Sequence, residues 1–405
     1  MLAHVSALET EHVGLLEIIG RVAADDLRSD IDIAPFAHSA MDGYALHTVD
    51  IESATEQAPV NLEVIAEVGA GSVFEGEIKP GQCVRIMTGA QLPEGADAVV
   101  KYEIVNVIEG DGKQGSTVSF AAPTKLRSNI REAGEEAKAG EVIVRAGEVI
   151  SSAGAGFLAG CGVLDVPTYR RPRIAIIATG SELVDPSEVP TAGKIRNSNS
   201  YAMAACAQEA GAVPTILPIV VDTYEALEAA VKDAVKDYDF VVTTGGAANG
   251  DYDFIKPVVE NLGELLMTTV NMRPGKAQTF GLVDGVPVFG LPGNPAAAYC
   301  GFELIIRAAL RKMQGYSCFE HPSVMAHLSK DVKKKDPRRI LLRSVLTVDE
   351  SGGYLCTPAQ NQSSGLFGVI QKTNCMAVMP EGLEPKAAGD LIECYLLDIP
   401  EEVVL

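Results

Sequence analysis

The sequence predicts a multidomain α/β plus β protein, in which a doubly wound α/β domain is joined by an elongated linker domain, an inserted β domain and a C-terminal β domain. Three observations support this fold class. At 405 residues, the chain is too long for one ordinary hydrophobic core. Short β-prone runs fill two separate stretches of the chain. Between these stretches, apolar runs typical of buried strands alternate with helical patterns, which indicates a mostly parallel sheet.

The linker and inserted domains come first along the chain. Residues 6–28 carry apolar side chains at helical spacing, which predicts a helix with Ser6 as its N-cap. Residues 36–127 contain the runs VNLEVIAEV, QCVRIMTG and STVSF, divided by Gly, Pro and Asp clusters, which favour a small antiparallel β domain. The Gly- and Ala-rich stretch that follows predicts a return to the linker domain. We therefore assign residues 1–35 and 128–168 to the linker domain and 36–127 to the inserted β domain.

The alternating pattern covers residues 169–317. RIAIIATG, TILPIVV, DFVVTTGG and VPVFGLPG predict strands, whereas NSYAMAACAQEAGA, TYEALEAAVKDAVKDY and AAAYCGFELIIRAALRKM predict helices. Short strands return at residues 318–405 and predict the C-terminal β domain. We interpret the lysine run at 333–335 as a solvated loop.

Composition argues against several classes of protein. The net charge is −21, there is no Trp and only 5% of residues are aromatic, so we expect no nucleic-acid partner. The eight cysteines include no CxxC pair and are interpreted as buried, reduced thiols rather than a structural metal site. The N-terminus does not resemble a signal peptide, and no run approaches the ~18 apolar residues of a membrane span. We expect a cytoplasmic protein that binds anions through local groups.

Three of the predicted strands end in loops suited to an anionic ligand, because ligands of open α/β sheets bind beyond the carboxyl ends of the strands. Glycine lets backbone N–H groups approach an anion, and a following helix start favours negative charge. Each loop alone could be only a tight turn, but three at one sheet edge favour a binding site. The candidate residues of these loops are Gly180, then Gly245, Gly246 and Gly250, then Pro292, Gly293, Asn294 and Pro295.

Charged residues accompany these loops. Arg273 and Lys276 flank a Pro-Gly turn and could pair with phosphate, or could be a solvated surface pair. Asp222 could join Asp253 or Glu182 around a divalent cation such as Mg²⁺, which prefers oxygen ligands. The alternative for Asp222 is a helix N-cap.

Asp42 and Thr88 lie beside glycines in the β domain. General principles alone favour structural roles for both residues.

Several motifs resemble, in order, the molybdopterin molybdenumtransferase family, which includes the C-terminal half of gephyrin. They are SAMDGYA (39–45), RIMTGA (85–90), PEGADAVV (93–100), TGSEL (179–183), IRNSN (195–199), TGG (244–246), PGK (274–276) and GLPGNP (290–295). The resemblance spans about residues 5–400 and implies the four domains named above. It also implies a homodimer whose active site combines the α/β domain of one subunit with the β and C-terminal domains of the other.

The activity implied by the resemblance is the insertion of molybdate into adenylylated molybdopterin, in molybdenum-cofactor biosynthesis. Hydrolysis of the pyrophosphate bond with a divalent metal, expected to be Mg²⁺, releases AMP, and the molybdopterin adenylyltransferase is a candidate partner. By position, the resemblance ties activity or binding to Asp42, Thr88, Glu182, Asp222, Asp253 and Lys276, and it matches Arg343 and Ser364 to a family Arg and a Gln-Gly-Ser turn.

The chain departs from the family pattern at Ala248, Ser181, Arg273, Glu136 and His38. Ala248 lacks a hydroxyl and Ser181 replaces a carboxylate, so a weakly active or inactive paralogue that binds or delivers the pterin, or acts as a scaffold, stays open. A third hypothesis is adenylylation of molybdopterin itself, against which the presence of four domains argues. The sequence leaves open molybdenum against tungsten and the identity of the divalent metal.

Overall fold

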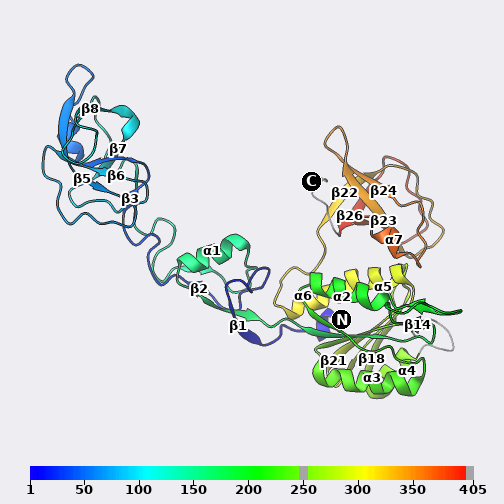
Figure 1. The fold of residues 1–405 in the computed structure, drawn as a ribbon. Helices are drawn as coiled ribbons and strands as arrows, with labels where there is room; N and C mark the ends of the chain where they lie inside the picture. The colour runs from blue at the N-terminus through cyan, green and yellow to red at the C-terminus, as the bar shows by residue number, and fades with distance from the viewer. Residues whose placement is uncertain (246–253, 398–405) are drawn as a thin grey trace. The chain divides into compact units, whose positions relative to one another are not determined.

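The structure is a computed structural model that describes residues 1–245 and 254–397 (Figure 1). The chain divides into two compact units. One contains Met1–Glu11, Gly20–Ala24 and Thr168–Leu405, and the other contains His12–Ile19 and Asp25–Pro167. Among the described residues, no helix has the length and apolar character needed to cross a bilayer.

The β sheet of the second unit has the strand order β7-β4-β6-β5-β9-β8. Its strands are β4 (Gly43–Leu46), β5 (Val60–Val68), β6 (Gln82–Ile86), β7 (Ala98–Lys101), β8 (Val105–Glu109) and β9 (Thr117–Phe120). The predicted strands are thus confirmed, but the prediction of a purely antiparallel sheet is wrong, because β5 and β6 pair in parallel. The chain between these two strands covers residues 69–81, and a parallel pair needs a crossover of about a dozen residues or more.

The helix predicted over residues 6–28 is wrong. This segment forms β1 (Thr10–Gly14) and β2 (Leu27–Arg28), preceded by a 3₁₀ turn, η1 (Leu2–His4). Leu16, which the helical spacing places on the apolar face, is 95% exposed. In the second unit, β2 pairs with β11 (Val142–Val144), and Asp26 accepts a hydrogen bond from the backbone of Ala146 at 3.0 Å. Partners more than a hundred residues away therefore replace the local bonds that a helix would make.

The rest of the second unit consists of short elements. Helix α1 (Ser152–Gly160) is capped by Ser151, whose hydroxyl accepts from the backbone of Gly154 at 3.1 Å. The remaining elements are β3 (His38–Ser39), which pairs with β10 (Ile130–Arg131), the 3₁₀ turns η2 (Thr48–Ile51) and η3 (Tyr102–Ile104), and β12 (Asp165–Tyr169), which ends in the other unit.

The α/β part of the first unit is doubly wound, as predicted, around a sheet of order β16-β13-β17-β21-β20-β18. Helices α2, α5 and α6 cover one face and α3 and α4 the other (Figure 1). Strands β16 (Val213–Ile216), β13 (Arg173–Ala178), β17 (Phe240–Thr244) and β21 (Val286–Leu291) are parallel. Strand β20 (Ala277–Val283) pairs antiparallel with both β21 and the edge strand β18 (Glu264–Thr269).

The predicted helices of this part are confirmed. They are α2 (Asn199–Glu209), α3 (Tyr224–Asp237) and the long closing helix, which runs as α5 (Pro295–Gly301), a π-helical turn η4 (Phe302–Ile306) and α6 (Arg307–Met313). A shorter helix, α4 (Ile255–Leu262), and the strand pair β14 (Leu183–Val184) and β15 (Ile195–Arg196) complete it.

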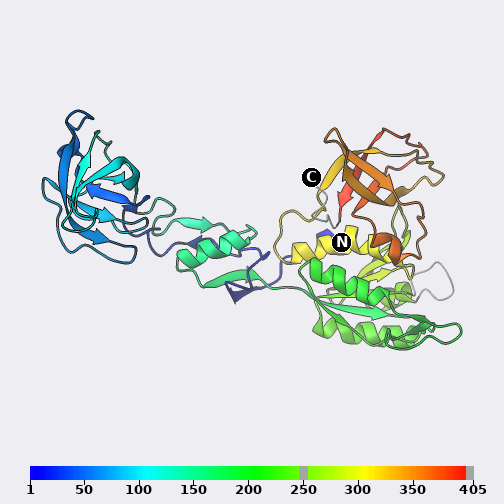
Figure 2. The same ribbon diagram turned by 45° about the horizontal axis from the view of Figure 1, so that its top comes forward.

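The C-terminal part is a closed ring of five strands, drawn in orange to red in Figure 2. In turn, β23 pairs with β24, β24 with β22, β22 with β26, β26 with β25, and β25 again with β23. The elements are β22 (Ser323–Leu328), β23 (Arg339–Val348), β24 (Tyr354–Pro358), β25 (Cys375–Met379), β26 (Leu391–Leu396), the short helix α7 (Phe367–Ile370) and β19 (Met272–Arg273), which adds to β23. Closure removes the free edges that would otherwise favour aggregation.

One residue of the predicted solvated lysine loop is buried. Lys334 is 7% exposed, and its ammonium donates to the backbone carbonyls of Pro380 and Gly382. Only its neighbours Lys333 and Lys335 face solvent, so the prediction of a solvated loop is wrong at its central position.

Candidate functional site

The three predicted loops meet at the carboxyl edge of the α/β sheet. The parallel pairing of β13 and β17 continues one residue further, where the N–H of Thr179 donates to the carbonyl of Thr244 at 3.0 Å. A cavity of about 80 Å³ opens there. Its lining includes Thr179, Glu182, Asn199, Thr244, Gly245, Gly293 and Pro295.

Gly245 is required at this edge for two reasons. Its φ is +92°, a left-handed conformation, and a Cβ there would lie 2.1 Å from the carbonyl oxygen of Thr179. Gly293 of the third loop is also close, since its own Cβ would lie 3.6 Å from the Cα of Gly245. Gly245 thus lets the backbones of neighbouring loops approach, as a backbone cradle for an anion requires.

Asn199 was not among the predicted site residues. Its amide nitrogen donates to the hydroxyl of Thr244 at 2.8 Å and to the carbonyl of Gly293 at 2.9 Å, so it joins two of the loops. Its Oδ1 is buried and has no hydrogen-bond partner in the described part of the chain. The motif IRNSN contained this signal, because an Asn at the start of a helix that follows a loop commonly bonds to nearby backbone.

Two predicted acids lie at the same edge. Glu182 is exposed and folds back over Gly180, where a Cβ would meet its carboxylate at 2.6 Å. Asp222 accepts a hydrogen bond from the hydroxyl of Thr179 at 3.2 Å. The alternative of an N-cap role for Asp222 is wrong, because Thr223 caps α3 by accepting from the backbone of Ala226 at 3.3 Å.

The third predicted acid, Asp253, lies outside the described residues, as do Gly246, Gly250 and Ala248. Within the described residues, Asp222 and Glu182 have no third acid, His or Cys close enough to complete a preformed cage. Mg²⁺ commonly takes one or two carboxylates and completes its shell with phosphate and water, so this donor set fits that ion.

A second cavity, of about 510 Å³, adjoins the first through Gly293, which lines both. It lies where the α/β part meets the C-terminal ring, and the carbonyl of Ser364 fixes that junction by accepting from the N–H of Ala296 at 2.8 Å. Four cationic side chains line it, and no acidic one does among the described lining residues. The cations are Arg273, Lys276, Arg338 and Arg343; the predicted residues Pro292, Asn294 and Ser364 also line it.

Arg343 is the most informative of these cations. It is 1% exposed, and its guanidinium makes one hydrogen bond, from Nη2 to the carbonyl of Ser363 at 3.2 Å. Its buried Nε has no partner among the described residues, and burial lowers the pKa of this side chain. Because a buried charge without acceptors costs free energy, an anion in the cavity would supply the missing acceptors.

The other cations are positioned by their neighbours. Arg338 and Arg273 share the carboxylate of Asp336, and hydrogen bonds from Arg338 hold the pKa of Asp336 well below its usual range. Lys276 is exposed and lines the cavity, so its charge is available to a ligand. Gln278, buried beneath the turn, donates to the carbonyl of Gly275 at 2.6 Å. Arg338 and Gln278 were missed because neither stands in a recognisable motif.

Asp42 and Thr88 belong to the second unit, whereas the residues above belong to the first. The carboxylate of Asp42 accepts from the N–H of Thr88 at 2.7 Å and from its hydroxyl at 2.8 Å. These two hydrogen bonds lower the pKa of Asp42. Both side chains are exposed, so this fixed carboxylate faces solvent rather than a core.

A larger cavity, of about 1000 Å³, lies elsewhere in the first unit. Glu209 and Glu303 line it, and Glu303 pairs with His321 at 2.9 Å. Arg307 and His321 line it too, so its charge is mixed, whereas the lining of the 510 Å³ cavity is cationic. Charge rather than size therefore identifies the 510 Å³ cavity as the candidate oxyanion site.

The sequence is similar to known proteins over almost its whole length. Residues 1–162 match the MoeA N-terminal region (domain I and II), 175–312 a probable molybdopterin binding domain, and 325–397 the MoeA C-terminal region (domain IV). The molybdopterin molybdenumtransferase of Bacillus subtilis (strain 168) is 38% identical over 96% of this chain and 90% of its own length. That of Staphylococcus aureus (strain COL) is 35% identical over 99% and 94%, respectively.

A solved structure supports the same assignment. The crystal structure of the molybdopterin biosynthesis MoeA protein of Pyrococcus horikosii matches with a TM-score of 0.81 at 30% identity, covering 98% of this chain and 96% of that one. The three family regions and the curated relatives together cover nearly the whole sequence. The chain therefore belongs to the molybdopterin molybdenumtransferase (MoeA) family.

Proposed function

We propose that this chain is a molybdopterin molybdenumtransferase that inserts molybdate into adenylylated molybdopterin, with hydrolysis of the pyrophosphate bond and release of AMP. One observation carries the proposal beyond family membership. A protein with a net charge of −21 gathers four cationic side chains around one cavity, next to glycine-rich loops at a sheet edge. Such a local concentration of positive charge suits oxyanion and phosphate ligands.

We assign a different part of the ligand to each of the two cavities. In this proposal, Lys276, Arg273 and Arg343 hold phosphate or molybdate oxygens in the 510 Å³ cavity. The loops with Gly245 and Gly293 hold the pterin side of the ligand through backbone N–H groups. Because Gly293 lines both cavities, one extended ligand can occupy them together.

Asp222, Glu182 and Asp253 are the proposed ligands of Mg²⁺. When bound, the ion would neutralise charge on the pyrophosphate oxygens. In the hydrolysis, the oxygen of water forms a bond to phosphorus, the bridging P–O bond breaks, and AMP leaves. The hydrogen bond from Thr179 keeps one oxygen of Asp222 oriented at the sheet edge.

The remaining assignments follow from the family alone. A homodimer, in which a second copy contributes Asp42 and Thr88 near molybdate, accounts for a fixed carboxylate outside the first unit. A cytoplasmic location and an adenylyltransferase partner that passes on its product are part of the same proposal.

The test is AMP release from the purified chain given adenylylated molybdopterin, molybdate and Mg²⁺. Lys276→Ala is expected to lower turnover on the order of 100-fold or more, because it removes a charge that stabilises developing negative charge. Lys232→Ala, an exposed lysine on α3, is the matched control and should leave the rate unchanged. AMP release that needs neither molybdate nor Lys276 would contradict the proposal. Saturable pterin binding without AMP release would instead identify a binding protein.

A further inference from the structure

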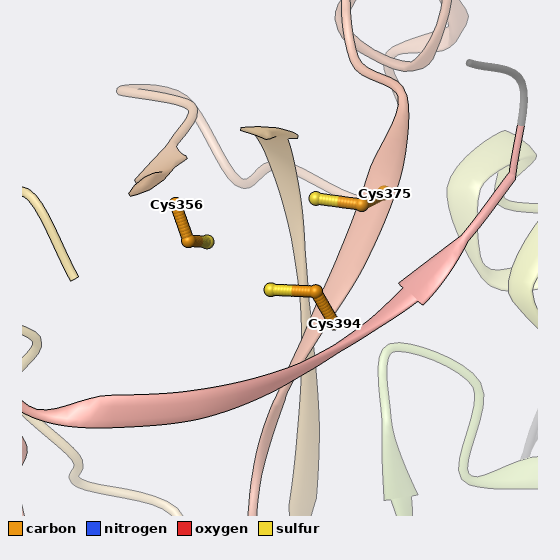
Figure 3. A group of neighbouring side chains, drawn as sticks. All are labelled: Cys356, Cys375 and Cys394. Carbon is orange, nitrogen blue, oxygen red and sulfur yellow. The ribbon is translucent and has the colours of Figure 1, made fainter. Parts of the chain in front are cut away.

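Three buried cysteines converge inside the C-terminal ring, away from the cavities described above. Cys356 lies on β24, Cys375 on β25 and Cys394 on β26. Each is fully buried, and their sulfur atoms all lie within 4.8 Å of one another. Figure 3 shows the three side chains pointing toward a common centre.

The pairing of the strands explains this convergence. Cys394 stands opposite Ala377 on β25, two residues beyond Cys375, so these two cysteines are diagonal neighbours on one face. Strand β23 pairs with both β24 and β25, and thereby brings Cys356 alongside them. Closure of the ring thus joins three thiols that are separated by 19 residues or more in the sequence.

The donor set is selective. The group contains three sulfurs and no His, Asp or Glu within the part of the chain that the structure describes. Zinc in structural sites takes four ligands, whereas soft thiolate donors also select Cu(I). At a metal–sulfur distance of ~2.3 Å, three sulfurs around a trigonal ion stand about 4 Å apart, so movements below about 1 Å would close the site.

We propose that Cys356, Cys375 and Cys394 form a binding site for a soft, thiolate-preferring metal ion of the Cu(I) class, distinct from the pterin and oxyanion site. The ion would bond to the three sulfurs, and the displaced thiol protons would leave to solvent. Because the sulfurs are enclosed by the core of the ring, binding would couple to the folding of this part of the chain.

Backbone contacts hold two of the three thiols in place. Cys375 donates to the carbonyl of Ser344 at 3.4 Å, and Cys394 donates to the carbonyl of Ile392 at 3.9 Å.

The alternative hypothesis is that the three cysteines are only small core residues. Measuring metal binding to the full-length reduced protein distinguishes this hypothesis from the proposed metal site. All variants carry Cys318→Ala, which removes the exposed thiol that could bind metal adventitiously. Cu(I) is titrated without oxygen against a chromophoric chelator, with both folded and refolded protein. Cys356→Ala, Cys375→Ala and Cys394→Ala are compared with Cys83→Ala, which removes a buried thiol in the other unit.

The expected result is one Cu(I) per chain, with three sulfur ligands by X-ray absorption and a higher midpoint of thermal unfolding. Each cluster variant should lose affinity by at least about 100-fold, whereas Cys83→Ala should bind as the parent does. No binding to folded or refolded parent protein would overturn the proposal, as would unchanged binding in the cluster variants or a disulfide between two of the three cysteines. If the cluster variants fail to fold, the X-ray absorption of the parent protein tests the proposal instead. Three sulfur ligands would support the site, and fewer than three would overturn it.

Discussion

Arg343 is a side chain whose burial lowers the stability of the free protein but suits the binding of an anionic ligand. A guanidinium at 1% exposure with an unpartnered Nε is a buried cation with unfilled donor positions. Natural cores avoid this arrangement, because replacing such a charge with an apolar group of similar size is often neutral or stabilising. Its presence beside three other cations therefore favours a role in binding.

We predict that Arg343→Met leaves the free energy of unfolding unchanged or raises it by up to about 2 kcal/mol, while it weakens oxyanion binding at least tenfold. Chemical denaturation and molybdate titration measure the two quantities. Arg339→Met, at an exposed position on the same strand, should change neither. A large loss of stability with unaltered molybdate binding would assign Arg343 to the core instead.

Asp42 offers a pH-dependent prediction at the same scale. Its pKa is lowered because the N–H and hydroxyl of Thr88 bond to the charged carboxylate. The stabilisation that results is present above the ordinary Asp pKa of 3.8 and is lost as pH falls through the lowered value.

Thr88→Val removes the hydroxyl and should raise the pKa of Asp42, as followed by NMR titration of its carboxyl carbon. Thr88→Ser keeps both donors and should titrate like the parent protein. An Asp42 pKa that is the same in all three proteins would show that the hydroxyl contributes nothing to the charged state.

At the scale of elements, the ends of β13 and β17 depend on the absence of a side chain at Gly245. Gly245→Ala would place a Cβ against the carbonyl of Thr179, in addition to the cost of a left-handed conformation. We predict a loss of about 2–4 kcal/mol in the free energy of unfolding, together with weaker pterin binding. Gly193→Ala is the matched control, because Gly193 has a φ of +77° and open space around it. It should cost only about 1–2 kcal/mol; equal losses in the two variants would rule out the clash.

The buried lysine of the C-terminal ring allows a similar comparison. Lys334→Met leaves the carbonyls of Pro380 and Gly382 without their donor, so the free energy of unfolding should fall by about 1–3 kcal/mol. Lys333→Met, next to it and exposed, should change stability by less than about 0.5 kcal/mol. Denaturant unfolding measures both variants. Equal free energies of unfolding would show that the hydrogen bonds of Lys334 do not stabilise the protein.

Some of these elements could be predicted from the sequence alone, and others could not. Continuous apolar runs such as RIAIIA and FVVTT predicted β13 and β17, because strands buried on both faces need no alternation. The prediction of a helix at 6–28 was wrong because its helical spacing is real, but its backbone partners lie in residues 142–146 and 168–170, which no local pattern reveals. The site divides in the same way. Its loops carry glycine motifs and Asn199 stands in the motif IRNSN, whereas Arg338 and Gln278 act through contacts that only the fold creates.

At the scale of the whole molecule, the proposed residues are distributed over two units. Lys276 and Asp222 belong to the first unit, and Asp42 belongs to the second. If each active site combines the first unit of one copy with the second unit of another, as the proposed homodimer requires, then two inactive variants can complement each other. This is a property of the assembly, because a site contained within one chain could never be restored by mixing.

Asp42→Asn and Lys276→Ala should each be inactive alone, yet regain activity after subunit exchange. Random exchange at equal amounts makes half of the dimers mixed, and each mixed dimer has one intact site of two, so AMP release should reach about a quarter of the parent rate. Mixing Lys276→Ala with Asp222→Asn is the control, since both changes lie in the first unit and every site in a mixed dimer carries one of them. Recovery in the first mixture alone would establish a shared site. No recovery in mixtures shown by mass spectrometry to contain mixed dimers would place Asp42 and Lys276 in the same chain's site.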